Sequence, residues 1–137
     1  MKLVLDTSFL IELKKGNELA RRVLEERKKD CEDLMISAIS IYELLAGAYY
    51  IWKRYGNARE MIIINEMLKS LTINPLDSSA AKRSAEVRAE LMLKGIVVPD
   101  IDIMIACSID EKSGEILTFD EDLLKLREIG FKVTIPK

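Results

Sequence analysis

Leu3-Val4-Leu5-Asp6-Thr7-Ser8, close to the start of the chain, is the stretch that decides the fold. Apolar residues in an unbroken run, led by Lys2, predict a short strand over residues 2–6 that is buried on both faces, as in a parallel sheet. The strand ends at an acid, and two hydroxyl residues open the segment that follows. The rest of the chain should therefore supply further short strands and the helices that cover them.

Segments of both kinds alternate along the remaining sequence. Further strands are expected over residues 34–36, 71–73, 115–118 and 132–134. Helices are expected over residues 8–15, 18–30, 38–55, 58–70, 78–94, 99–112 and 121–129. Ser37, Asn57 and Asp77 are the predicted N-caps of the third, fourth and fifth of these helices. Pro99 suits the first turn of the sixth.

Alternation of short buried strands with helices implies right-handed crossovers. The predicted fold class is therefore α/β, with a central parallel sheet of about five short strands flanked by helices on both faces. The sequence contains no internal repeat and no linker, and its 137 residues suit a single domain over residues 1–137. In open sheets of this type, sites form at the carboxyl ends of the strands, where the strand order reverses.

Composition excludes several kinds of chemistry. The chain has no histidine, which rules out a Ser-His-Asp triad, a Cys-His pair and a histidine zinc site. Its formal net charge is -2, so nucleic-acid binding would depend on local basic patches or on metal ions. Cys31 and Cys107 are isolated, and no apolar run approaches the roughly 18 residues of a membrane span. A cytoplasmic protein that does not enter the membrane is expected.

Four acids stand at the places where such a sheet forms its site. Asp6 follows the first strand, Asp120 follows the fourth, and Glu43 and Asp102 lie in the first turns of two helices among apolar neighbours. Converging carboxylates repel one another unless a cation is present, and hard oxygen ligands select Mg²⁺ or Mn²⁺. Such ions activate a water and stabilise the leaving oxygen of a phosphodiester.

Each acid also has a purely structural interpretation. Asp6 could cap a helix that begins at Thr7, and Glu43 could form a capping box with Ser40 or lie on a solvated helix face. Asp102 could serve only the helix dipole.

Two further acids leave the ligand set open. Asp100 and Asp102 both lie in a helix first turn, and Asp120 and Asp122 could both cap the last helix. Asp100 and Asp122 are therefore possible additional acids of the site.

The residues considered so far resemble the PIN-domain nucleases, and specifically the small VapC-type toxins of toxin–antitoxin pairs. The similarity covers essentially the whole chain and rests on four pieces in the family's order: Leu3-Val4-Leu5-Asp6-Thr7-Ser8, Ser37-Ala38-Ile39-Ser40-Ile41-Tyr42-Glu43-Leu44-Leu45-Ala46-Gly47, Asp102-Ile103-Met104-Ile105-Ala106 and Leu117-Thr118-Phe119-Asp120. The first piece alone is weakly specific, whereas the four together are fairly specific.

The resemblance implies a set of roles for this chain. Asp6, Glu43, Asp102 and Asp120 would be the catalytic, metal-binding acids. The hydroxyls that orient a carboxylate or a water would be those of Thr7, Ser8 and Thr118. The resemblance further implies cleavage of single-stranded RNA with Mg²⁺ or Mn²⁺, a homodimer, and inhibition by a small cognate antitoxin protein. Asp102 matches the family's acid, which places Asp100 outside the ligands.

Other functions remain open from the sequence. A PIN-fold nuclease could process RNA without an antitoxin, and a non-catalytic module could keep the fold. A phosphotransfer or receiver-type domain also carries an acid after its first strand, but here Ser8 stands where related phosphatases have a second Asp. The basic residues of segment 14–29 could guide RNA, although interleaved acids favour a solvated face. Aromatic residues between 42 and 55 favour a core or dimer interface over base stacking.

Overall fold

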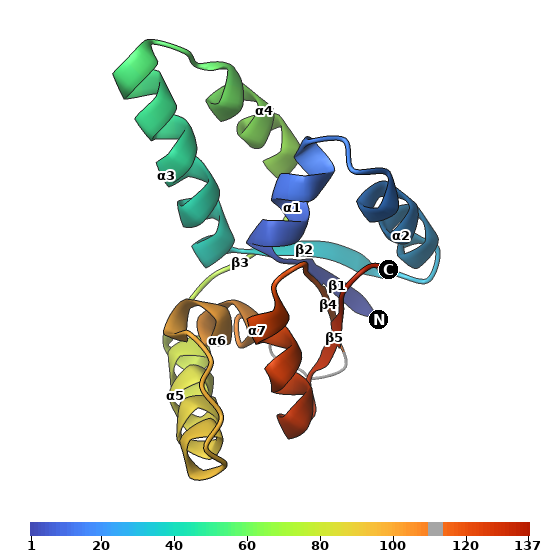
Figure 1. Cartoon of the computed structure of the whole chain (residues 1–137), viewed down its shortest axis with the longest axis vertical. Coiled ribbons are helices and arrows are strands. Elements are labelled where there is room, and N and C mark those ends of the chain that lie inside the picture. Colours follow the sequence, from blue (N-terminus) through green and yellow to red (C-terminus); the bar gives the residue numbers. More distant parts are fainter. Residues whose placement is uncertain (110–113) are drawn as a thin grey trace.

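A five-stranded, entirely parallel sheet forms the centre of the molecule (Figure 1). The structure is a computed structural model that describes residues 1–109 and 114–137. The strand order is β3-β2-β1-β4-β5. The strands are β1 (Lys2–Leu5), β2 (Asp33–Ser37), β3 (Thr72–Asn74), β4 (Glu115–Leu117) and β5 (Lys132–Thr134).

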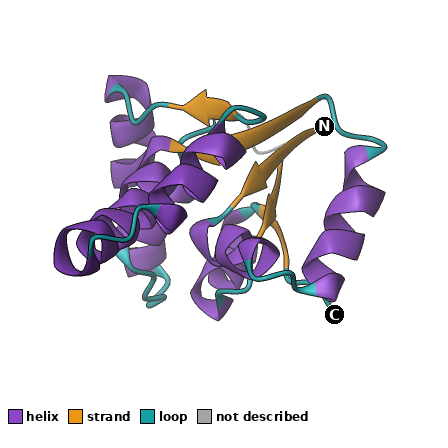
Figure 2. Cartoon of the chain, turned by 90° about the horizontal axis from the view of Figure 1, so that it is seen from above, coloured by secondary structure: helices purple, strands orange, loops and turns teal. Residues whose placement is uncertain are grey.

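Helices cover both faces of this sheet (Figure 2). One face is covered by α1 (Thr7–Lys14), α2 (Glu18–Lys28), α3 (Ala38–Tyr55) and α4 (Arg59–Leu68). The other face is covered by α5 (Ser78–Leu93), α6 (Asp100–Ala106), α7 (Glu121–Leu124) and the 3-10 helix η1 (Lys125–Ile129). The predicted α/β architecture is therefore confirmed, with a hydrophobic core on each side.

Successive side chains of the central strand β1 point to opposite faces and pack into the two cores in turn. Leu3 and Leu5 pack into the core under α1–α4, whereas Val4 packs into the core under α5–α7. All three side chains are at most 2% exposed, because both faces of the sheet are covered. Short strands without a polar alternation are what such a doubly covered sheet requires.

Most predicted helices differ from the observed ones by one or more residues at an end, most clearly at α4, α6 and α7. Ala58, not Asn57, is the N-cap of α4, although the Asn57 side chain still accepts a hydrogen bond from the Arg59 amide at 2.9 Å. The last predicted helix is divided into α7 and η1. The predicted end of the sixth helix, near residue 112, lies outside the described residues, but α6 itself ends at Ala106.

Side chains donate hydrogen bonds to backbone carbonyl groups at the point where α6 ends. The guanidinium of Arg83 donates twice to the carbonyl of Cys107, at 3.2 and 2.8 Å. The Ser108 hydroxyl donates to the carbonyl of Ile105 at 2.7 Å. Because these carbonyl groups already have partners, the helix has no need to continue in order to satisfy them. Sequence periodicity did not reveal the contact of Arg83 with Cys107, because these residues are distant in the sequence.

The strand order indicates at which edge of the sheet a site is expected. From the central strand β1 the chain builds β2 and β3 on one side, then returns to place β4 and β5 on the other. The order therefore reverses at β1, and its carboxyl end is the expected position of a site. In the described part of the chain, no helix is long and apolar enough to cross a membrane.

Candidate metal centre

Asp6 lies where the sheet topology predicts a site. Leu5 pairs with Leu117 of β4, and the Asp6 amide donates to the Leu117 carbonyl at 3.0 Å. This register sets Asp6 level with Thr118, the residue that follows β4. The Asp6 side chain also caps α1 by accepting from the Ser8 amide at 3.3 Å, so capping and a place in the site are compatible.

Three donors converge on one oxygen of the Asp6 carboxylate. The hydroxyls of Ser8 and Thr118 each donate to Oδ2 at 2.7 Å, beside the Ser8 amide. Both hydroxyls also accept backbone hydrogen bonds at 2.9 Å, from Phe119 and Asp120 respectively. Among residues 1–109 and 114–137, no hydrogen bond to Oδ1 accompanies them, so this oxygen is the one that remains for a ligand.

The hydroxyl of Thr7 connects the start of α1 to Glu43 on α3. The Thr7 hydroxyl donates to Oε1 of Glu43 at 2.6 Å and lies 2.9 Å from Oγ of Ser40. Ser37 is the N-cap of α3, and its side chain accepts from the Ile39 amide at 3.1 Å. The capping box of Ser40 with Glu43 is therefore wrong, because Ser40 lies inside the helix and Glu43 contacts a different element.

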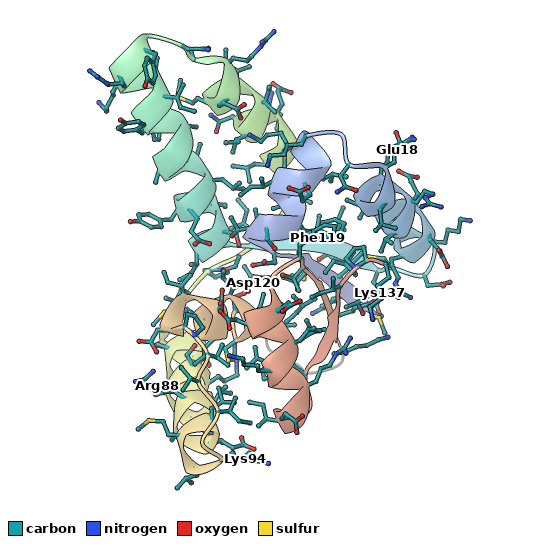
Figure 3. All side chains as sticks on the ribbon, in the orientation of Figure 1. Glu18, Arg88, Lys94, Phe119, Asp120 and Lys137 are labelled. Carbon is teal, nitrogen blue, oxygen red and sulfur yellow. The ribbon has the colours of Figure 1, made fainter. Side chains whose placement is uncertain are left out.

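Three carboxylates gather between α6 and α7. Asp102, Asp120 and Asp122 each offer one oxygen, and these oxygens lie within 4.8 Å of one another. Asp120 also caps α7 by accepting from the Asp122 amide at 2.9 Å. Phe119 stacks on Phe9 of α1, with ring centroids 5.7 Å apart, while Asp120 lies beside α6 and α7 (Figure 3). The structure thus adds Asp122 to the group.

The electrostatics of Asp102 show how closely these acids interact. Burial, and after it the repulsion of four neighbouring carboxylates, together raise the pKa of Asp102 from 3.8 to about 7. In order of decreasing effect, these neighbours are Asp120, Asp6, Asp122 and Glu43. All five acids therefore belong to one electrostatic cluster, although their elements are far apart in the sequence.

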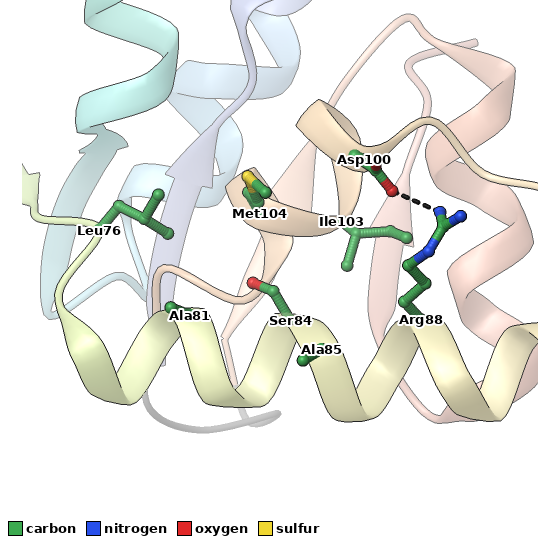
Figure 4. A pocket seen from close by; sticks show the side chains of 8 residues that line it. All are labelled: Leu76, Ala81, Ser84, Ala85, Arg88, Asp100, Ile103 and Met104. Atoms are coloured by element: carbon green, nitrogen blue, oxygen red, sulfur yellow. Dashed lines mark hydrogen bonds and ion pairs between the residues drawn. The ribbon is translucent and has the colours of Figure 1, made fainter.

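The Asp100 side chain contacts α5 and not the other acids. Its carboxylate forms an ion pair with Arg88 of α5, with Nη1 and Oδ1 2.5 Å apart (Figure 4). This pair borders an apolar cavity of about 230 Å³ between α5 and α6, with Ile103 and Met104 in its wall. Residues 100 and 102 lie on different sides of one helix, so the structure separates Asp100 from the acid cluster.

Several of the basic residues in segment 14–29 form ion pairs with acids of the same chain. Lys14 contacts Glu60, Arg21 contacts Glu18, and Arg27 contacts the buried Glu115. These pairs favour the solvated-face interpretation over an RNA guide. The aromatic residues of α3 are largely exposed, so the chain's own core does not bury them: Tyr42, Tyr49, Tyr50, Trp52 and Tyr55.

Among the described residues, none packs closely against the position that a Cβ on Gly47 would occupy. A Cβ built on this residue meets nothing within 4 Å, although close helix packing is the usual explanation for such a glycine. Within the described residues, no neighbouring helix therefore requires glycine here.

The arrangement fits a divalent ion by the chemistry of its donors. Carboxylate oxygens from several segments, held within one small volume, are the ligands that Mg²⁺ and Mn²⁺ prefer. The free Oδ1 of Asp6 adds another hard donor at the same edge of the sheet. A cation would also offset the mutual repulsion that raises the pKa of Asp102.

Comparison with known proteins agrees with this architecture. The chain is 29% identical over 106 residues to the tRNA(fMet)-specific endonuclease VapC of Salmonella typhimurium, which covers 77% of this chain and 76% of that protein. The structure also matches a chain of the DNA-bound VapBC complex of S. typhimurium, with a TM-score of 0.75, 26% identity and 98% of each chain covered. VapBC2 from Rickettsia felis, bound to a promoter DNA fragment, matches with a TM-score of 0.78, 20% identity and 100% of each chain covered.

The family assignment rests on a match along most of the sequence. The family model described as the PIN domain matches residues 3–129, which include every acid of the cluster. The five-stranded parallel sheet and the helices on both of its faces agree with this match. This chain belongs to the PIN domain family.

Proposed function

We propose that this chain is a metal-dependent endoribonuclease, the toxin of a VapBC-like toxin–antitoxin pair, that hydrolyses phosphodiester bonds of single-stranded RNA. The observation that carries the proposal is the carboxylate cluster at the carboxyl end of β1. Three of its acids offer oxygens within 4.8 Å of one another, and the fourth and fifth contribute to the raised pKa of Asp102. The similarity to a relative named as an endonuclease supports the same activity.

The proposed ligands of Mg²⁺ or Mn²⁺ are the acids of this cluster: Asp6, Glu43, Asp102, Asp120 and Asp122. When bound, such an ion lowers the pKa of a coordinated water and stabilises the negative charge of a phosphodiester. Phosphate oxygens of the RNA would supply further ligands to it, so an acidic chain can still bind a polyanion.

The chain's own side chains prepare the cluster for this role. Ser8 and Thr118 hold Oδ2 of Asp6, so that Oδ1 would be the oxygen available to an ion, while Thr7 donates to Glu43. A bound cation would lower the pKa of Asp102 and favour its ionised form, because the ion would offset the electrostatic cost of that charge.

The proposed partners are a cognate antitoxin and a second copy of the chain, in the cytoplasm. Two kinds of observation support a protein partner. The similar structures include VapBC complexes. Large apolar side chains are also exposed along α3 and α4, including Tyr50, Tyr55 and Ile62, each more than half exposed. Exposed apolar surfaces of this kind mark protein interaction sites.

The test compares two acids of one helix. We expect Asp102→Asn to lower cleavage of single-stranded RNA in Mg²⁺ at least a hundredfold, because it removes a ligand charge from the buried centre. Asp100→Asn is the matched control, since its carboxylate pairs with Arg88 outside the cluster. Equal activity of Asp102→Asn and the wild-type chain would refute the proposal.

A further inference from the structure

Lys125 contacts both an acid of the candidate metal centre and the backbone of the segment that precedes α6. Its ammonium lies 3.0 Å from Oδ1 of Asp122 and donates a hydrogen bond to the carbonyl of Val97 at 2.9 Å. Asp122 belongs to α7, whereas Val97 belongs to the segment that connects α5 to α6. One side chain thus contacts an acid of the cluster and the backbone segment that leads into α6.

The segment that contains Val97 determines where α6 begins. Val98 is buried in the core at 4% exposure, while Val97 is 78% exposed and few side-chain contacts hold it. Pro99 follows as the N-cap of α6, and Asp102 lies in the first turn of that helix. A contact at Val97 therefore acts on the position of Asp102 through only five residues of chain.

The approach of the carboxylates depends on this placement. Asp102 reaches within 4.8 Å of Asp120 and Asp122 only while α6 and α7 keep their relative position. Ionised carboxylates this close to one another repel. A positive side chain that contacts Asp122 of α7 and the backbone just before α6 opposes that separation.

We propose that Lys125 is a positioning residue, which fixes the Asp122 carboxylate and the 95–99 segment in the geometry that binds the metal ion. The inference rests on the proposed function, because it assumes that the cluster binds a cation. Ordinary exposed ion pairs between neighbouring turns of a helix contribute little to stability. The additional contact with Val97, on another element, is what distinguishes Lys125 from such a pair.

Two effects of removing Lys125 have opposite signs, so one measurement separates them. Loss of a nearby positive charge alone would strengthen cation binding, by less than about threefold for a half-exposed group in high dielectric. Loss of positioning would weaken cation binding, by about tenfold for a residue that orients a ligand. The positioning effect is the larger of the two, and we expect it to prevail.

The experiment measures Mn²⁺ affinity by calorimetry and amide hydrogen exchange of residues 94–101 in three variants of the full chain. Lys125→Met keeps most of the unbranched side chain without its charge, and Lys125→Arg restores charge and reach. Lys69→Met is the matched control, because Lys69 forms an exposed ion pair with Glu66 at the same spacing, with an N–O distance of 2.8 Å. Lys125→Met should bind Mn²⁺ about three- to tenfold more weakly, because the charge effect offsets part of the positioning effect, and should exchange faster, while the other two variants stay within about twofold of wild type.

The outcomes separate this inference from the proposed nuclease activity. Unchanged or tighter Mn²⁺ binding in Lys125→Met overturns the positioning role, even if the 94–101 amides exchange faster. Weaker binding that Lys125→Arg does not restore also overturns it. If the wild-type chain binds Mn²⁺ and shows the expected pattern but cleaves no RNA, the proposed activity fails while the role of Lys125 stands.

Discussion

Asp6 receives three donors on a single oxygen, and two of these donors are hydroxyls that also accept backbone hydrogen bonds. Each hydroxyl is therefore a fixed link between the carboxylate and the chain after β4. Such links orient a ligand group and hold it ready for an ion. At the residue scale, the site depends on Ser8 and Thr118 as well as on its acids.

Replacing Thr118 by Val tests this dependence. The substitution keeps the shape but removes the donor to Asp6 and the acceptor for the Asp120 amide, both in a buried position. We expect a loss of about 1–3 kcal/mol in the free energy of unfolding. RNA cleavage should fall about 10- to 100-fold. Urea unfolding and a cleavage assay measure the two effects.

Thr72→Val is the control for this substitution. The Thr72 hydroxyl also donates to a carboxylate, that of Asp33, at 2.7 Å, but this contact is exposed and distant in the sheet from the acids. Unfolding should change by less than about 0.5 kcal/mol, and cleavage should not change. Equal effects of the two substitutions on cleavage would contradict the role given to Thr118.

Sequence reasoning identified many site residues and left others unresolved. The acids Asp6, Glu43, Asp102 and Asp120 lie in one electrostatic cluster, as their positions at strand ends and helix starts suggested. Asp122 stayed ambiguous, because spacing alone does not tell which way a carboxylate points in a short helix. The contact of Lys125 with Asp122 follows an i,i+3 spacing, but its bond to Val97 joins distant segments and left no sequence signal.

At the scale of elements, the register of the sheet aligns the site. Pairing of Leu5 with Leu117 sets the ends of β1 and β4 at one level, and pairing of Val4 with Met35 brings the end of β2 nearby. The element that follows each strand then starts at this edge. Apolar runs predicted the strands because burial on both faces requires them. Where α6 ends depends on Arg83 and other tertiary contacts, which sequence periodicity does not encode.

The N-cap of α3 offers a test of how an element positions the site. Ser37→Ala removes the side-chain acceptor for the Ile39 amide, and α3 carries Glu43. Unfolding should cost about 1 kcal/mol less, and a frayed first turn should lower cleavage several-fold. Asn17→Ala removes the equivalent cap of α2, which holds no acid of the cluster. It should lose similar stability and keep full cleavage activity; the reverse pattern would be inconsistent with this view of α3.

On the scale of the whole molecule, helices on two faces of one sheet bring together charges that repel one another. The cores hold α6 and α7 against one face and α1 and α3 against the other, and their acids meet at the edge between them. Packing therefore opposes the repulsion in the protein without metal. Membership of the PIN family, shown by the match over residues 3–129, replaces the receiver-type alternative.

This balance makes the stability of the metal-free protein depend on pH. The pKa of Asp102 is about 7 in the folded chain and 3.8 in the unfolded chain, so the folded state favours the protonated form. The free energy of unfolding should therefore fall by a few kcal/mol as pH rises from about 4 to about 7, and then level off. Urea unfolding in a chelator measures this slope.

Asp102→Asn is the control, because its neutral side chain removes the titration from the folded state. Its stability should lose this downward trend, and above pH 7 without metal it should exceed that of the wild-type chain. An identical pH profile for the two proteins would contradict the assigned electrostatic coupling.

The most direct test of the central claim is the anomalous scattering of Mn²⁺ in crystals of the full chain grown near pH 8. We predict an anomalous peak within ligand distance of carboxylate oxygens from Asp102 and Asp120, and we expect Asp102→Asn crystals to lose it. Wild-type crystals that diffract well but show no peak at the carboxyl end of β1, at Mn²⁺ concentrations that support RNA cleavage, would contradict the claim that these acids jointly bind the ion.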